Sequence, residues 1–437
     1  MGGIMLVVLA CQIAFAGDFE DGVSALRDGR AADAETLFLA AVADDPQRVE
    51  AWWELGWSHW ARDEFAEAIE AWLQVQRLQP DHRQVPRWLA AAQTRQMLGQ
   101  IEVGAIDVPM ESFGRSIRFA AAGDTMLGSD LRRGEAGLAP GDGSMLFTDV
   151  ADIFATADVA FLNLEGTLAD GLPSTKCGPD STNCYAFRTP TRYAQALVSA
   201  SIDVVSNANN HAMDLGEPGM VSTLAALDAV GVAHSSRYGD VAKLDIDGIV
   251  VAVVSAHSGS CCLNVNRIEE VQGAIVQADE DADIVVLSFH GGREGASARH
   301  VPGQVEIAWG ERRGDVKALS RAAIDAGADL VIGHGPHVLR AMEVYRGRLI
   351  AYSLGNFCGY KQFGTQGGHG GTSLVLDVEL AQNGVLTGAR IHPMLLDSTG
   401  IPRPDPDGAA VEAIRELSLA DFPDSGVRVD DLGVLSW

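Results

Sequence analysis

The first hundred residues repeat a helical pattern of apolar positions. The spacing of these positions predicts amphipathic helices over Val23–Leu26, Ala32–Val42, Ala51–Trp60, Phe65–Leu78 and Val85–Met97. Residues 34 positions apart are alike in type: Gly22 and Gly56, Leu26 and Trp60, Ala34 and Ala68, Phe38 and Trp72, Pro46 and Pro80. This is the period of tetratricopeptide repeats, in which small and aromatic residues meet where helices pack. We therefore predict an all-α, tetratricopeptide-like unit over residues 17–100.

The role of this unit has two readings. It could be a helical spacer, or it could bind a protein partner. Five of its tryptophans bear on the choice, because they could form a binding surface or simply fill the core: Trp52, Trp53, Trp57, Trp60 and Trp72.

A different pattern begins after a poorly periodic linker, which we place at residues 101–116. Short apolar runs then alternate with helical stretches, and the runs are too apolar for strands exposed on one face. The predicted strands are Ile117–Ala122, Val159–Leu162, Val204–Ser206, Ile249–Ser255, Ile284–Phe289, Leu330–Ile332 and Leu349–Ser353, followed by an antiparallel pair near Ser373–Leu380 and Ala389–Leu395. The pattern predicts an α/β domain over residues 117–400, and the acidic, proline-containing stretch 401–437 reads as a surface tail.

Polar residues recur directly after these predicted strands. The candidates are Asp124, Glu165, Asn210, His211, His290, His334 and His337. Ligands of α/β sheets bind beyond the carboxyl ends of the strands, so these side chains are expected to converge. Carboxylate, amide and imidazole groups together suit divalent metal ions, possible identities being Mn, Fe, Zn or Mg, and a bridging carboxylate can hold a pair of them. The sequence therefore predicts a metal site. It contains no G-x-S-x-G motif for a nucleophilic serine.

At these positions the chain resembles the CapA family of poly-gamma-glutamate synthesis proteins. The matching stretches are Gly123-Asp124-Thr125-Met126-Leu127-Gly128, Asn163-Leu164-Glu165-Gly166, Ala208-Asn209-Asn210-His211 with Asp214 and Gly216, His290 with Glu294, Gly333-His334 with Pro336-His337-Val338, and Tyr352-Ser353-Leu354-Gly355-Asn356-Phe357. The family is similar to calcineurin-like metallophosphoesterases. The resemblance thus implies a four-layer αββα sandwich of two sheets between helices.

The resemblance also implies roles for the candidate residues. Asp124 would begin the metal site, and Glu165 would stand where the superfamily has its bridging aspartate. Asn210 would be a ligand and a catalytic residue, and His211 would face the leaving oxygen. The remaining metal ligands would be His290, His334 and His337.

Three departures from the superfamily and family patterns leave fewer of the expected metal-site residues. Met126 replaces the histidine of the superfamily's Asp-x-His motif, a change that the family shares. Gly335 replaces the middle histidine of the family's Gly-His-His-Pro-His motif, and Gly291 replaces the usual tryptophan after His290.

The amino-terminal residues predict export. Ile4 to Phe15 is an apolar run that ends in an A-x-A-like site, so residues 1–16 read as a signal peptide, although this run has no preceding Lys or Arg. Cys11 lies in an imperfect lipoprotein box, which makes a lipid anchor an alternative. We expect a periplasmic or cell-surface location, where Cys177 and Cys184 could form a disulfide. Cys261 and Cys262 could be buried thiols or a vicinal bond.

Net charge limits the partners. The formal net charge of −27 argues against a nucleic-acid partner, because phosphate backbones select basic surfaces. Two functions remain in competition. The first is a metal-dependent hydrolase or transferase acting on a cell-envelope polymer, which the family resemblance implies to be of poly-gamma-glutamate type. The second is a non-catalytic binding or scaffold subunit of a polymer synthesis and export complex, whose helical repeats recruit protein partners.

Overall fold

The computed structural model describes residues 16–102, 115–174, 176–177, 184–362 and 368–437. The chain divides into two compact units, one comprising residues up to Arg115 together with Tyr345–Gly347, the other comprising the rest. Residues 1–15 of the predicted leader, with Cys11, and most of the predicted linker lie outside the described residues. Within the described residues, no helix combines the length and the hydropathy that a membrane span requires.

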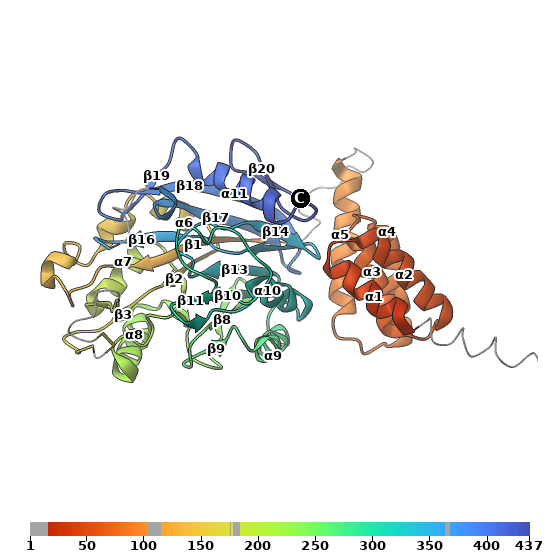
Figure 1. The fold of residues 1–437 in the computed structure, drawn as a ribbon, viewed down its shortest axis with the longest axis horizontal. Helices are drawn as coiled ribbons and strands as arrows, with labels where there is room; N and C mark the ends of the chain where they lie inside the picture. Colours follow the sequence, from red (N-terminus) through yellow and green to blue (C-terminus); the bar gives the residue numbers. More distant parts are fainter. Residues whose placement is uncertain (1–15, 103–114, 175, 178–183, 363–367) are drawn as a thin grey trace, which may run out of the picture. The chain divides into compact units, whose positions relative to one another are not determined.

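The amino-terminal unit consists of helices that each pack against the next one in the chain (Figure 1). They are α1 (Ala16–Arg27), α2 (Ala31–Asp44), α3 (Val49–Trp60), α4 (Phe65–Leu78) and α5 (Val85–Glu102). A Cβ at Gly22 would lie 2.7 Å from the Phe38 ring, and one at Gly56 would lie 2.2 Å from the Trp72 indole. The repeated glycines therefore let each aromatic ring approach the preceding helix, and the predicted repeat is confirmed.

The tryptophans of this unit belong mainly to its core. Trp57, Trp60, Trp72 and Trp88 are all buried, and the ring centroids of Trp57 and Trp88 are 4.4 Å apart. Burial of these large rings stabilises the small helical unit. These four side chains are therefore not available as a binding surface.

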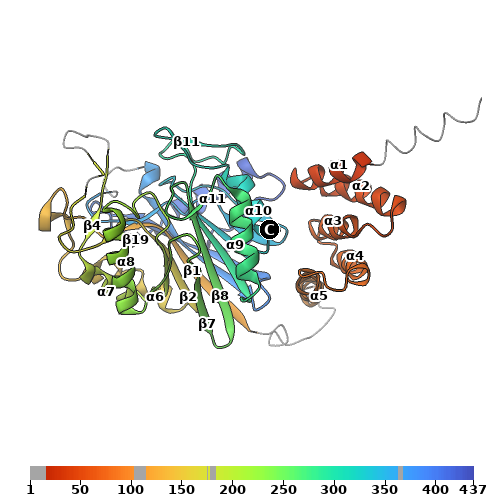
Figure 2. The same ribbon diagram turned by 90° about the horizontal axis from the view of Figure 1, so that it is seen from below.

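The second unit is a mixed α/β domain built on two large sheets, seen from two directions in Figures 1 and 2. In the first sheet the order is β19 (Pro402–Pro404), β18 (Leu386–Leu396), β17 (Thr372–Ala381), β1 (Ser116–Met126), β2 (Val159–Leu164), β5 (Val204–Ser206) and β6 (Ala233–Ser235), and β16 (Asn356–Gly359) pairs with β1. In the second sheet it is β14 (Met342–Tyr345), β15 (Arg348–Ala351), β13 (Leu330–His334), β10 (Ile284–His290), β8 (Ile249–His257) and β7 (Ala242–Ile246), and β9 (Leu263–Asn264) pairs with β8.

The central strands of each sheet are parallel. This holds for β1, β2, β5 and β6, and for β8, β10, β13 and β15. The late pair β17 and β18 is antiparallel, as predicted. Short two-stranded ladders complete the domain: β3 (Thr167–Leu168) with β4 (Arg188–Thr189), β11 (Ile307–Ala308) with β12 (Glu311–Arg312), and β20 (Arg428–Val429) with β21 (Leu435–Ser436).

Side chains of the two sheets share one buried cluster. Phe119 and Phe161 of the first sheet belong to it together with Val253, Val286 and Ile332 of the second. On its other side, the first sheet packs against α6 (Ala151–Ala155), α7 (Ala194–Ser199) and α8 (Gly216–Val230). Helices α9 (Ile268–Asp279) and α10 (Val316–Asp325) contact β8, β10 and β13 of the second sheet.

The carboxyl-terminal stretch 401–437 is part of the fold, so the prediction of a surface tail was wrong. Strand β19 extends the first sheet, and α11 (Ala409–Asp421) packs on β17 and β18. Ala410 and Ile414 are fully buried in the cluster that the two sheets share. The acidic and proline residues at its start obscured the helical spacing of apolar residues that follows them.

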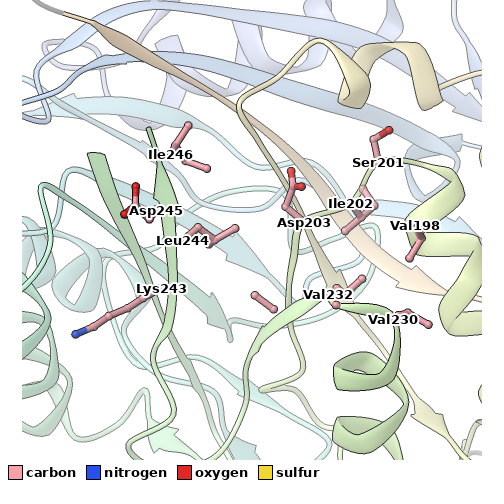
Figure 3. Close-up of a pocket in the computed structure, with 12 residues that line it drawn as sticks. Val198, Ser201, Ile202, Asp203, Val230, Val232, Lys243, Leu244, Asp245 and Ile246 are labelled. Atoms are coloured by element: carbon pink, nitrogen blue, oxygen red, sulfur yellow. The ribbon is translucent and has the colours of Figure 1, made fainter. Parts of the chain in front are cut away.

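A pocket of about 480 Å³ lies at the amino-terminal ends of the parallel strands (Figure 3). Its lining includes Asp203, which precedes β5, Ala233 at the start of β6, and Asp245 near the end of β7. The predicted site residues lie at the opposite, carboxyl ends of these sheets. This pocket is therefore separate from the candidate site.

Candidate functional site

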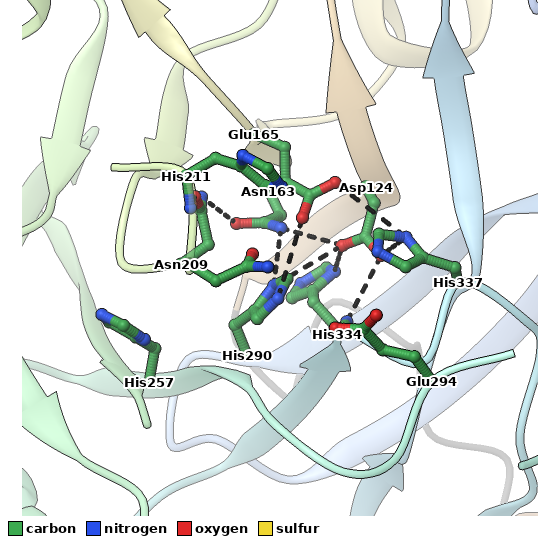
Figure 4. A network of polar contacts seen from close by, with 12 residues as sticks. Asp124, Asn163, Glu165, Asn209, His211, His257, His290, Glu294, His334 and His337 are labelled. Atoms are coloured by element: carbon green, nitrogen blue, oxygen red, sulfur yellow. Dashed lines mark hydrogen bonds and ion pairs between the residues drawn. The ribbon is translucent and has the colours of Figure 1, made fainter. Parts of the chain in front are cut away.

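Asp124 is the centre of the predicted site. It lies within β1, paired with Asn163 of β2, and is fully buried. Its Oδ2 is 3.0 Å from Nδ1 of His337, and its Oδ1 is 3.7 Å from Nδ1 of His334 and 3.9 Å from Nδ1 of His290. The ends of β1, β10 and β13 thus bring these side chains together, as predicted from their positions after apolar runs (Figure 4).

Glu165 forms the second acidic group. It follows β2 and is almost completely buried, with Oε1 3.7 Å from Nε2 of His290 and Oε2 4.0 Å from Nδ1 of His337. Asp124, Glu165 and His337 each offer a ligand atom within 4.8 Å of the others'. His337 adopts a left-handed backbone with φ of 58°, a strained conformation that is common at functional sites.

Several buried polar atoms of this cluster lack a hydrogen-bond partner in the part of the chain that the structure describes. They are both carboxylate oxygens of Glu165, Nε2 of His290 and both ring nitrogens of His334. A buried acceptor that makes no hydrogen bond is costly. A divalent cation would satisfy such atoms, and the donor set of carboxylates and imidazoles is one that these metals bind. The residues present therefore fit the predicted metal.

The pKa shifts of His290 and His334 agree with this fit, whereas Glu165 must lose a proton before it binds a metal. Burial raises the pKa of Glu165 to about 8, with the charge of Asp124 acting in the same direction. Burial alone would raise the pKa of Asp124, but the hydrogen bond and charge of His337 hold that pKa below its usual range. Burial lowers the pKa of His334 to about 4 and that of His290 well below its ordinary value. Both imidazoles are thus neutral at pH 7, the form that binds metals.

His211 is oriented by a carboxylate. Its Nδ1 lies 2.8 Å from Oδ2 of Asp214, and its ring centroid lies 4.4 Å from that of Phe187. Asp214 is buried and also accepts hydrogen bonds from the backbone N–H of Phe187 and from Nζ of Lys176. An imidazole held through Nδ1 keeps Nε2 for a reacting group. Asp214 is thus a positioning residue that was not among the predicted site residues.

The amide contacts of the site involve residues other than the predicted Asn210. Asn163 donates to Oδ1 of Asp124 at 2.8 Å, and Asn209 donates to Oδ1 of Asn163 at 3.1 Å. Asn210 has a buried Oδ1 for which the described residues supply no hydrogen-bond partner. Its role as ligand and catalytic residue stays a prediction. Asn163 and Asn209 belong to the polar motifs that follow the predicted strands, and this position could have identified them from sequence.

The predicted Cys177–Cys184 disulfide is present in the structure. Cys261 and Cys262 are bonded to each other, which selects the vicinal bond over buried thiols. Nε2 of His257, at the end of β8, lies 3.3 Å from Sγ of Cys261.

Comparisons with known proteins agree with this architecture. A family model described as "Bacterial capsule synthesis protein PGA_cap" matches residues 118–361, and a tetratricopeptide repeat model matches residues 19–83. Similar proteins include the PGA biosynthesis protein CapA of Bacillus subtilis, 33% identical over 188 residues that cover 39% of this chain and 46% of that protein. The capsule biosynthesis protein CapA of Bacillus anthracis is 31% identical over 185 residues, covering 37% and 41%.

The match to these two relatives spans under half of their own length. The family model, in contrast, covers more than half of this chain and includes every residue of the metal cluster. The chain therefore belongs to the bacterial capsule synthesis protein family PGA_cap, with tetratricopeptide repeats before the family domain.

Proposed function

We propose that the protein is an exported, metal-dependent hydrolase or transferase that acts on a capsule or related envelope polymer of poly-gamma-glutamate type. The observation that carries the proposal is the set of buried nitrogen and oxygen atoms of Glu165, His290 and His334 for which the described residues supply no hydrogen-bond partner. The names of the relatives refer to PGA and capsule biosynthesis, which supports the class of polymer. The proposal includes a four-layer metallophosphoesterase arrangement, supported by the shared core of the two sheets.

The residues that would hold the metal are Asp124, Glu165, His290, His334 and His337, with Asn210 as a further predicted ligand. When bound, a divalent metal or metal pair supplies Lewis acidity that activates water and stabilises negative charge developing on an oxygen.

The chain's own contribution to proton transfer comes from His211. Asp214 holds Nδ1 of this ring, so Nε2 is the nitrogen that would face the reacting group. Burial lowers the pKa of His211, with the charge of Asp214 acting against that effect, so the ring is neutral at pH 7 and would first take up a proton at Nε2 from water, then pass it to the departing oxygen or nitrogen. Phe187 packs on the same ring, and both His211 and Asp214 are buried, which limits the movement of the imidazole. The orientation of the His211 ring is thus fixed before substrate binds.

The test is turnover of the full chain loaded with Mn or Zn, on a phosphodiester and on a gamma-glutamyl amide. We expect wild-type activity on one of them and a loss of about 10²–10⁴-fold for His211→Ala, the range for removal of a general acid. His300→Ala is the matched control, because His300 is an exposed histidine paired with Asp421. A metal-loaded wild-type protein that is inert on both substrates would contradict the enzymatic proposal for those bonds.

The alternative is a non-catalytic binding subunit that recruits partners through its repeats. One observation favours a protein-binding surface: Leu39 on α2 and Leu73 on α4 are equivalent repeat positions, and both are exposed, at 46% and 41%. Leu39→Glu with Leu73→Glu would abolish partner binding in affinity capture without changing metal content. Equal capture by the variant and the wild type would count against this role.

A further inference from the structure

Alternate residues of the stretch 305–309 expose apolar side chains. Val305, Ile307 and Trp309 are 39%, 50% and 79% exposed, whereas Glu306 and Ala308 between them are buried. Val305 and Ile307 flank the buried Glu306, and Trp309 follows them at the turn after β11. Contiguous exposed apolar side chains on a soluble domain commonly mark a binding surface. We call Val305, Ile307 and Trp309 the apolar ridge.

The exposed indole of Trp309 is held in place. Trp309 and Gly310 form the turn between β11 and β12, with φ of 52° and 83°. Turns of this kind favour Asn-Gly, and a bulky residue in the left-handed region is strained. The Trp309 Nε1–H donates to Oε2 of Glu294 at 2.8 Å. The turn and this hydrogen bond hold the Trp309 indole in one orientation, although the ring is exposed to solvent.

Glu294 contacts both Trp309 and residues close to the predicted metal centre. It follows His290 by four residues, and its other carboxylate oxygen is paired with the buried Arg313. Its negative charge contributes to the raised pKa of both Glu165 and His337. Figure 4 shows Glu294 among the cluster residues. Trp309 therefore contacts a carboxylate whose charge acts on two residues of the metal cluster.

We propose that the apolar ridge is a glycan-binding subsite, in which the indole of Trp309 packs against the face of a neutral sugar ring. The C–H groups of a pyranose face carry partial positive charge and suit the negative face of an indole. The carboxylates of Glu294 and the exposed Glu311 lie beside the ridge and can accept hydrogen bonds from sugar hydroxyls. At the ridge itself, these two carboxylates favour a neutral ligand over an anionic one.

This inference goes beyond the proposed function, because it concerns what the ridge binds and does not require turnover. The test is calorimetric titration of the full chain with the tetramer of β-1,4-linked N-acetylglucosamine, and separately with a gamma-glutamyl oligomer. We expect the wild type to bind the sugar tetramer, Trp309→Ala to bind it about tenfold more weakly or worse, and Trp309→Phe to retain most of the affinity. Leu419→Ala is the control, since Leu419 is 69% exposed on α11.

Four outcomes would overturn the inference. They are no binding of the sugar tetramer by the wild type, equal binding by wild type and Trp309→Ala, binding of only the gamma-glutamyl oligomer, and a dimer in solution that Trp309→Ala abolishes. Ile307→Ser provides a second variant, expected to weaken the same binding without removing the Trp309–Glu294 hydrogen bond. The titrations measure binding and not turnover, so their result is independent of whether His211→Ala loses activity.

Discussion

Gly335 and Gly291 lie against each other next to the metal ligands. A Cβ on Gly335 would be 3.0 Å from the carbonyl oxygen of Gly291 and 3.1 Å from its nitrogen, and the Gly291 N–H donates to the carbonyl of His334 at 2.9 Å. These are the two positions where this chain has glycine and the family pattern has histidine and tryptophan. The two substituted positions are therefore neighbours in the structure. His290 and His334, beside them, stay in the predicted site.

Gly335→Ala is expected to destabilise the domain by roughly 2–4 kcal/mol, because the new Cβ meets backbone atoms in addition to a strained φ of 108°. Gly239→Ala is the matched control: its φ is 87°, but nothing lies within 4 Å of the new Cβ. It should cost only about 1 kcal/mol. Urea unfolding measures both, and equal losses of unfolding free energy would contradict the close contact.

Metal binding is expected to strengthen as pH rises from about 5 towards 8. The pKa of Glu165 is raised to about 8, so below that pH a cation must displace a proton from this carboxyl. Burial lowers the pKa of His337, but Glu165 and Asp124 raise it to about 10, so a cation must displace a proton from this ring as well. Titration calorimetry in buffers of different ionisation enthalpy measures the proton release. Glu165→Gln should release fewer protons than the wild type; a pH-independent affinity would argue against this protonation state.

Asp214→Asn is expected to lower kcat about 10–100-fold with little change in KM, because the amide no longer fixes the ring of His211. It should also alter the pH profile of kcat, which a purely structural loss would not do. Asp228→Asn offers a matched control, since Asp228 contacts Nε2 of His234 at 3.2 Å and is largely exposed. Unchanged kcat for a folded Asp214→Asn protein would remove Asp214 from the mechanism.

Helix α11 allows a paired test of the carboxyl-terminal stretch. Ile414→Ala should cost about 2–5 kcal/mol, the range for truncating a fully buried side chain. Leu419→Ala, on the exposed side of the same helix, should change stability by less than about 0.5 kcal/mol. Thermal unfolding of the two variants decides between a core helix and a surface tail, because a tail predicts no difference.

The sequence predicted the repeats and the central strands because both depend on apolar periodicity. It placed Asp124 after a strand, whereas Asp124 lies inside β1 and pairs with Asn163, since polar site residues interrupt the apolar run that marks a strand. Apolar periodicity does not predict contacts between segments that are distant in the sequence. The Asp214–His211 pair was visible only as a motif, and the alternation of residues 305–309 is too short to mark a functional surface from sequence.

The central claim is that Asp124, Glu165, His290, His334 and His337 form a divalent metal centre. Metal content of the purified full chain, measured by mass spectrometry after equilibration with Mn or Zn and removal of free ions, tests it most directly. We predict about one or two equivalents of metal in the wild type and in His300→Ala, and a strong loss in Glu165→Gln and in His290→Ala. A wild-type protein that retains neither metal, or variants that retain as much as the wild type, would contradict it.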